Sequence, residues 1–331
     1  MEVKNGKVVS AAKPAPEKAD LLKGKHILSA GQFIKEELDL LMDTAAYYEK
    51  KMQDGERLQD MTGKVAASLF FEPSTRTRLS FETAMHRLGG AVITVAESAK
   101  SQTSSTAKGE TMADAIRVVD LYADVIIMRS PQKGAADEAA EVAVNPVINS
   151  GDGAGEHPTQ ALLDIYTILK EKGSLLGLTV TLLGDLKFGR TVHSLIRLLS
   201  HYGCRIILVA PSQLSMPDDI VAGVAKFGVE VKQTEDLQEA VKESDVLYAT
   251  RIQKERFDSE EEYNAVKDKY IVDSGVVAAG KKGMIIMHPL PRVNEITVEV
   301  DNYEGAAYFR QAGNGVPIRM ALLALVKGVL K

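Results

Sequence analysis

Hydroxyl and guanidinium side chains are concentrated just after an apolar segment, residues 64–71, that has the length of a buried strand. The group is Ser74, Thr75, Arg76, Thr77 and Arg78, at the start of a predicted helix. A helix N-terminus offers unpaired N–H groups and a positive dipole end, and arginine adds a pair of donors suited to phosphate. Helix capping and solvated arginines would explain part of this pattern. Five such residues together predict a phosphate site.

Two more candidate residues follow later apolar segments. Arg129 ends the run Ile126–Met128, where it either points into a cleft or forms a local ion pair. His157 ends a glycine-rich turn, and Pro158 marks the start of the next helix, so His157 and Gln160 share one face of its first turn. A lone histidine is more often structural, but its position in a turn after a strand favours a role in the site.

The segment Gly184–Thr191 is close to the spacing of a nucleotide-binding P-loop, but Arg190 stands where the motif requires lysine. No G-x-G-x-x-G motif follows a predicted strand, so a dinucleotide-binding protein is an alternative without specific support. The histidines form no His-x-x-x-His pair and Cys204 is the single cysteine, which argues against a metal site and a disulfide framework.

Two further predicted strand ends are rich in polar residues. Arg251, Gln253, Lys254 and Arg256 follow a predicted strand at 245–250, although a charged exposed loop would have the same composition. In the second, prolines flank Leu290, which predicts a fixed backbone and a cis bond before Pro291. Such a loop can direct carbonyl acceptors at a substrate amine.

Strand and helix patterns alternate along the chain, which predicts an α/β fold with two doubly wound parallel-sheet domains, helices on both faces of each sheet and a cleft between the domains. In such sheets ligands bind at the carboxyl ends of the strands. Strands are predicted at 64–71, 91–95, 124–129, 146–149, 178–183, 205–210, 229–232, 245–250 and 284–287.

Composition indicates a tail at the start of the chain, and Gly173 and Gly177 indicate a domain boundary. We expect residues 1–24 to be a flexible tail or linker, and residues 25–157 to form the first domain, with the helix 315–331 packing back on it. The helix 158–172 would join the domains, and residues 173–314 would form the second.

Composition limits the function classes. The 331 residues carry a formal net charge of −5, which argues against a nucleic-acid partner that requires surplus lysine and arginine. No apolar run reaches the ~20 residues of a membrane span, and the N-terminus is not typical of a signal or transit peptide. We therefore expect a cytoplasmic protein without membrane association.

Several segments together resemble the aspartate/ornithine carbamoyltransferase family from about residue 23 to the C-terminus. They are Ser74–Arg78, His157–Gln160, Gly184–Arg190, Arg251–Arg256 and His288–Arg292. The Pro-Leu-Pro loop without a cysteine and the Arg-x-Gln segment favour the aspartate branch over the ornithine branch. Ser130 departs from the family pattern, which has histidine there, and the segment before Lys108 also differs.

The resemblance implies transfer of the carbamoyl group from carbamoyl phosphate to L-aspartate, an early step of pyrimidine biosynthesis. It implies a homotrimer with shared active sites and neither metal nor organic cofactor. The first domain would bind carbamoyl phosphate and the second aspartate. Regulatory chains or fused pathway domains remain open as partners. The alternatives are a carbamoyltransferase for another amine such as ornithine, and a non-catalytic homologue.

The residue roles implied by the resemblance fall into five groups. The phosphate would be held by Ser74, Thr75, Arg76 and Thr77, and the carbamoyl oxygen by Thr77, Arg129 and His157. Gln160 and the backbone carbonyls of Pro289, Leu290 and Pro291 would hold the carbamoyl nitrogen. The aspartate carboxylates would be bound by Arg190, Arg251 and Gln253. Ser104 and Lys108 would reach the neighbouring subunit's site, and Glu72 would bridge to Arg190 and Arg256 on domain closure.

Overall fold

The computed structural model describes residues 10–96, 109–253, 257, 259–266 and 269–330. The chain divides into two compact units. The N-terminal unit comprises residues 10–166 and 314–330 of the described chain, and the C-terminal unit comprises residues 167–313. The boundary falls inside one helix, α6 (Pro158–Lys172), which is the segment predicted to join two domains.

The N-terminal unit contains a parallel sheet with the strand order β2-β1-β3-β4. The strands are β1 (Val65–Phe70), β2 (Ala91–Ala96), β3 (Val125–Ser130) and β4 (Val147–Asp152). The chain runs from β1 outward to β2 and then returns to β3 on the other side of β1. This reversal makes the carboxyl ends of β1 and β3 the topological switch point, where open α/β sheets bind ligands.

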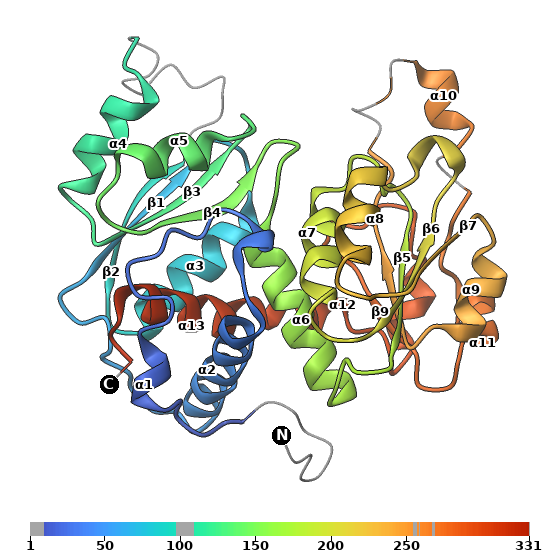
Figure 1. Cartoon of the computed structure of the whole chain (residues 1–331), viewed down its shortest axis with the longest axis horizontal. Helices are drawn as coiled ribbons and strands as arrows, with labels where there is room; N and C mark the ends of the chain where they lie inside the picture. The colour runs from blue at the N-terminus through green and yellow to red at the C-terminus, as the bar shows by residue number, and fades with distance from the viewer. Residues whose placement is uncertain (1–9, 97–108, 254–256, 258, 267–268, 331) are drawn as a thin grey trace. The chain divides into compact units, whose positions relative to one another are not determined.

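Helices cover both faces of this sheet (Figure 1). On one face α4 and α5 pack together, and on the other α3 packs on β1 and β2, with α13 against α3 and α2. The chain leaves this unit through α6. The bounds are α1 (Pro16–Ala19), η1 (Ala30–Gln32), α2 (Lys35–Gln53), α3 (Thr75–Arg87), α4 (Met112–Asp120), α5 (Ala135–Val142) and α13 (Gly315–Lys327).

The C-terminal unit repeats the same design with the strand order β7-β6-β5-β8-β9, again all parallel. Its switch point lies between β5 and β8. The strands are β5 (Thr179–Leu183), β6 (Arg205–Val209), β7 (Val231–Thr234), β8 (Val246–Ala249) and β9 (Ile285–Met287). The helices are α7 (Arg190–Leu199), η3 (Ser212–Leu214), α8 (Asp218–Ala225), α9 (Leu237–Glu243), α10 (Glu260–Asn264), α11 (Ser274–Ala279), η5 (Val298–Asn302) and α12 (Tyr308–Gly313).

The central strands are apolar on both faces because helices cover both sides of each sheet. β3 and β8 are buried along their whole length, and the side chains around β5, β6 and α9 form one continuous apolar core in the C-terminal unit. Among the described residues, no helix is both long enough and apolar enough to cross a bilayer.

The predicted fold class, with two doubly wound parallel sheets, is confirmed. The predicted tail was too long, because Leu22 is fully buried and the N–H of Gly24 donates to the carbonyl of Val326 at 2.8 Å. The fourth strand was predicted too short: β4 continues to Asp152 because its last residues pair with β3 across a register shift between Met128 and Ser130. The strand predicted at 229–232 is displaced to 231–234.

Candidate active site

The predicted anion segment forms the first turn of α3, which follows the carboxyl end of β1. Ser74 occupies the N-cap position with an extended backbone, but within the described chain its side chain makes no capping hydrogen bond. Helix capping therefore does not account for Ser74 in the predicted pattern. The N–H groups of the first turn and the hydroxyl of Ser74 are both suited to an external anion. Thr77 is buried, whereas Thr75 and Arg76 are exposed.

Arg129 lies near the end of β3 and is buried among polar groups. Its Nη2 lies 3.2 Å from Oε2 of Glu72, and its Nη1 donates to the carbonyl of Ser150 at 3.3 Å. Glu72 follows the carboxyl end of β1 and Arg129 belongs to the neighbouring strand β3, at the switch point of the sheet. The contact with Glu72 orients the guanidinium group. The predicted pairing of Glu72 with Arg190 and Arg256 stays a prediction.

His157 and Gln160 lie at the start of α6, in the turn that follows β4. The N–H of Gln160 donates to the carbonyl of His157 at 3.0 Å, and both side chains are buried. Because β4 is the neighbour of β3, these two residues and Arg129 lie at the carboxyl edge of one sheet. The position of Pro158 as the first residue of α6 confirms the predicted helix start.

In the C-terminal unit, Gln253 connects the segments that follow β5 and β8. Its Nε2 lies 3.4 Å from Oδ2 of Asp185 and 3.3 Å from the carbonyl of Phe188. Gly184 allows this approach, because a Cβ there would lie 2.5 Å from the carbonyl oxygen of Thr250. Arg190 begins α7 after β5, and Arg251 follows β8, so both belong to the switch point of the second sheet.

The Pro289–Pro291 loop follows β9 and contains the predicted cis bond between Leu290 and Pro291. The backbone of Leu290 has φ 58°, a conformation that favours glycine, and its N–H donates to Nδ1 of His288 at 2.8 Å. Nε2 of His288 lies 2.8 Å from Oε1 of Glu295, with both side chains almost fully buried. The buried pair of His288 and Glu295 therefore holds the backbone of the loop in place through the N–H of Leu290.

The carboxylate of Glu295 stabilises this loop in its charged form. Burial alone would raise the pKa of Glu295, but the contact with His288 and the N–H groups of Glu295 itself and of Val293 together hold the pKa below its usual value. A group whose pKa is lower in the folded state adds stability above its unfolded pKa of about 4.3, and that stability is lost as the pH falls through the folded pKa.

We expect Glu295→Gln to lower the free energy of unfolding by about 1–3 kcal/mol at pH 7, because a buried charged hydrogen bond is weakened. The deficit relative to the unsubstituted protein should shrink as the pH is lowered from 6 towards 3. Urea unfolding across this range measures it, with the exposed Glu299→Gln as the control. A deficit independent of pH would contradict the assigned charge of Glu295.

Sequence reasoning missed the supporting acidic residues. Asp185 is fully buried, burial raises its pKa, and it accepts from the N–H of Phe188 at 2.9 Å. The position of Asp185 directly after β5, beside Gly184, could have identified it from the sequence. No local pattern identifies Glu295, because it contacts His288 only through the fold of the loop between them. Ser104, Lys108 and Arg256 lie outside the described residues.

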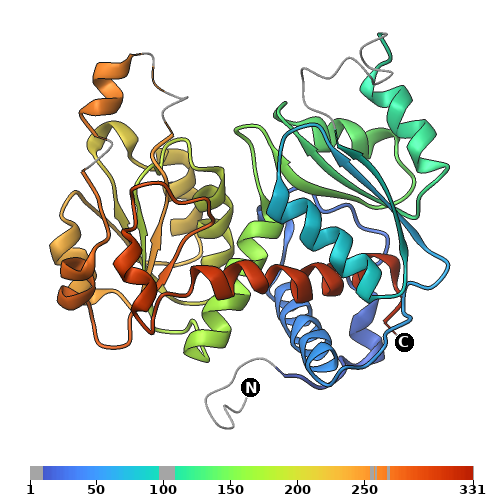
Figure 2. The same ribbon diagram turned by 180° about the vertical axis from the view of Figure 1, so that it is seen from behind.

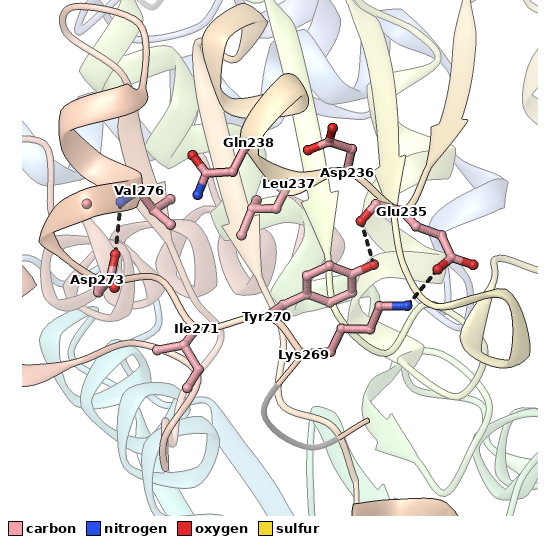
Figure 3. A pocket seen from close by; sticks show the side chains of 10 residues that line it. Glu235, Asp236, Leu237, Gln238, Lys269, Tyr270, Ile271, Asp273 and Val276 are labelled. Atoms are coloured by element: carbon pink, nitrogen blue, oxygen red, sulfur yellow. Dashed lines mark hydrogen bonds and ion pairs between the residues drawn. The ribbon is translucent and has the colours of Figure 1, made fainter. Parts of the chain in front are cut away.

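A pocket of about 760 Å³ also lies in the C-terminal unit, but it does not contain the predicted site residues (Figure 3). Several polar groups that line this pocket form hydrogen bonds or ion pairs with one another. Lys269 pairs with the carboxylate of Glu235, the hydroxyl of Tyr270 donates to the carbonyl of Glu235, and Asp273 accepts from the N–H of Val276. The described residues also contain no group of three or more side chains suited to a metal ion.

Two family models match the chain, one for each half. The carbamoyl-phosphate-binding domain of aspartate/ornithine carbamoyltransferases matches residues 25–170. The aspartate/ornithine-binding domain of the same family matches residues 176–326. Together with the paired sheets and the strand-end site, these matches define a carbamoyl-transferring enzyme of two α/β domains. The chain belongs to the aspartate/ornithine carbamoyltransferase family.

Two of the three relatives described next are named as aspartate carbamoyltransferases. The aspartate carbamoyltransferase catalytic subunit of Thermococcus gammatolerans is 51% identical over 93% of this chain and 99% of its own length. The multifunctional protein CAD of Squalus acanthias is 50% identical over 92% of this chain and 13% of that protein. The crystal structure of Trypanosoma cruzi aspartate transcarbamoylase with N-(phosphonacetyl)-L-aspartic acid has a TM-score of 0.87 and 46% identity, covering 93% of this chain and 97% of that one.

Proposed function

We propose that this chain transfers the carbamoyl group of carbamoyl phosphate to the amino group of L-aspartate, giving N-carbamoyl-L-aspartate and phosphate in pyrimidine biosynthesis. One observation carries the proposal. The segments expected to bind phosphate lie at the switch point of the first sheet, and those expected to bind the aspartate carboxylates lie at the switch point of the second. The 51% identity to an aspartate carbamoyltransferase catalytic subunit supports aspartate as the acceptor.

The N-terminal unit would bind carbamoyl phosphate. The first turn of α3, with Ser74, Thr75, Arg76 and Thr77, presents N–H, hydroxyl and guanidinium donors to the phosphate. Arg129 and His157, with Thr77, would polarise the carbamoyl oxygen and stabilise the oxyanion of the tetrahedral intermediate. Gln160 would accept a hydrogen bond from the carbamoyl nitrogen. The family resemblance adds the carbonyls of the Pro289–Pro291 loop, which belongs to the C-terminal unit.

The C-terminal unit would bind aspartate through Arg190, Arg251 and Gln253. Two guanidinium groups at separate strand ends suit a dicarboxylate, because each can pair with one carboxylate. Ornithine carries one carboxylate and a second amine, which a pair of arginines would repel. This charge argument favours aspartate over ornithine at the same site.

The reaction needs little covalent participation from the protein. The neutral amine of aspartate attacks the carbamoyl carbon, the C–O bond to phosphate breaks, and the amine proton passes to the departing phosphate. Catalysis would come from holding the two substrates in line and from stabilising the oxyanion. A side-chain base is not required, because phosphate can accept the proton.

Product analysis tests this proposal. Purified full-length chain is incubated with carbamoyl phosphate and either L-aspartate or L-ornithine, and the carbamoylated amino acid and phosphate are quantified. We expect both products in equal amounts with aspartate and only background hydrolysis with ornithine. Turnover with ornithine alone would assign the chain to the other branch, and turnover with neither would indicate a non-catalytic homologue.

We further propose a homotrimer with shared active sites, in the cytoplasm. The homotrimer is supported by strand β2, which lies at the edge of its sheet and exposes Ile93 and Val95. Leu79 is exposed on the adjoining helix α3. An exposed edge strand with apolar side chains is a pairing surface that stable monomers avoid. The segment with Ser104 and Lys108 follows β2 directly in sequence.

Placing a charge on this edge should dissociate the trimer. We expect Val95→Lys to elute near the monomer mass of 35.9 kDa in size-exclusion chromatography with light scattering, and the unsubstituted chain near three times that mass. Val144→Lys is the matched control, because Val144 is 88% exposed in a loop of the same unit. A trimeric Val95→Lys variant would place the interface elsewhere.

A further inference from the structure

The side-chain amide of Gln160 is oriented by a carboxylate one turn further along α6. Its Nε2 donates to Oδ1 of Asp164 at 2.9 Å, and Asp164 is fully buried. An ionised carboxylate can only accept hydrogen bonds, so the amide must turn its NH₂ group towards Asp164. The amide oxygen of Gln160 is then left to serve as an acceptor for a ligand.

Asp164 interacts with a buried arginine from the C-terminal helix. Arg319 on α13 is 2% exposed, and it interacts electrostatically with Asp164. Burial lowers the pKa of Arg319 to about 9, with the charge of Asp164 acting in the opposite direction, so the guanidinium group remains cationic at neutral pH. A buried carboxylate beside a buried cation is stabilised as the anion.

The packing leaves Arg319 little freedom. Its Cζ lies 4.9 Å from the ring centroid of Phe81 on α3, which is a cation–π distance. At Gly315, one turn earlier on α13, an added Cβ would lie 2.2 Å from Nη1 of Arg319. Glycine at this position therefore makes room for the guanidinium group.

The same arginine contacts the helix that carries the anion segment. Phe81 lies one turn after Thr77 on α3, and α13 packs along α3 in the N-terminal unit (Figure 2). Arg319 thus links the helix that would bind the phosphate with the residue that orients Gln160. Neither Asp164 nor Arg319 is placed among the residues that would contact substrate.

We propose that Asp164 and Arg319 are positioning residues that hold Gln160 with its amide oxygen towards the acyl group of the substrate. The site thereby selects an acyl phosphate that carries an NH₂ group over one that carries a methyl group. This inference rests on the proposed function. It adds a determinant of specificity that lies outside the contact residues.

Asp164→Asn should invert the amide of Gln160. The positive charge of Arg319 favours the carbonyl oxygen of the new side chain on the Arg319 side, so that the NH₂ group faces Gln160. Gln160 must then offer its oxygen to position 164 and its own NH₂ group to the ligand. A carbamoyl NH₂ group would meet another donor and lose its hydrogen bond, whereas the methyl group of acetyl phosphate has none to lose.

The test compares the dissociation constants of carbamoyl phosphate and acetyl phosphate, titrated into the full-length chain. We expect Asp164→Asn to weaken carbamoyl phosphate binding about tenfold or more and acetyl phosphate binding less than about twofold. Equal weakening of both ligands, or no change in either, would overturn the inference. Asp120→Asn is the control, because Asp120 is a hydrogen-bonded aspartate of the same unit, accepting from the N–H groups of Val144 and Asn145, but lies at the amino end of the sheet.

Two further variants keep the test decisive. Adding Gln160→Glu to Asp164→Asn restores an acceptor towards the ligand and should recover the preference for carbamoyl phosphate. If Asp164→Asn does not fold, Gly315→Ala displaces Arg319 by crowding and should give the same selective loss. Failure of the unsubstituted chain to bind carbamoyl phosphate would instead refute the proposed function.

Discussion

Replacing Arg129 by alanine should lower kcat about 10²–10³-fold, the effect of removing one donor from an oxyanion site. Arg129 is buried, and its guanidinium group is oriented by Glu72 at 3.2 Å and by the carbonyl of Ser150 at 3.3 Å. A group held in this way requires no reorganisation when negative charge develops on the carbamoyl oxygen. Steady-state kinetics with both substrates measures the loss.

Two controls separate this catalytic effect from a loss of stability. Arg117→Ala removes an exposed arginine from the same unit and should leave kcat unchanged. Adding Glu72→Gln to Arg129→Ala removes the charge that Arg129 would have balanced, so it should recover stability without recovering activity. Full activity of the folded Arg129→Ala variant would remove Arg129 from the site.

Replacing Arg251 by alanine should reduce kcat/KM for aspartate about a hundredfold or more, because charge-assisted hydrogen bonds to a carboxylate are lost. The affinity for carbamoyl phosphate should stay within about twofold, since the phosphate donors lie in the N-terminal unit. Initial rates as a function of aspartate, together with direct titration of carbamoyl phosphate, distinguish the two effects.

Arg205→Ala is the matched control for this variant. Arg205 is an arginine of the same unit whose guanidinium group pairs with Glu230 and Glu243 at the surface. Its replacement should leave aspartate kinetics unchanged. An Arg251→Ala variant that loses carbamoyl phosphate and aspartate affinity to the same extent would contradict the division of the site between the two units.

Much of the fold and of the candidate site could be predicted because ligands bind at the carboxyl ends of parallel strands. Parallel strands are apolar along their length, so the first polar residues after each one are visible in the sequence. Arg129, His157 and Arg251 were selected as candidates in this way, and Pro158 marked the start of α6. The last three residues of β4, 150–152, were not predicted as strand because they are polar or glycine.

Residues that act through tertiary contacts left no local pattern. Arg319 lies within an apolar C-terminal helix, and its partners Asp164 and Phe81 are far away in the sequence. The contact between Glu72 and Arg129 likewise depends on the adjacency of β1 and β3. The tail was misjudged because composition does not reveal that Leu22 packs into the unit.

The central claim is that each chain provides both a phosphate site and an aspartate site for one reaction. Calorimetric titration of the full-length protein with N-(phosphonacetyl)-L-aspartic acid, the ligand of the T. cruzi relative, tests it most directly. We predict one molecule bound per chain, about a hundredfold or more tighter than phosphonoacetate, because one molecule occupies both sites. Affinity no greater than that of phosphonoacetate would contradict the account.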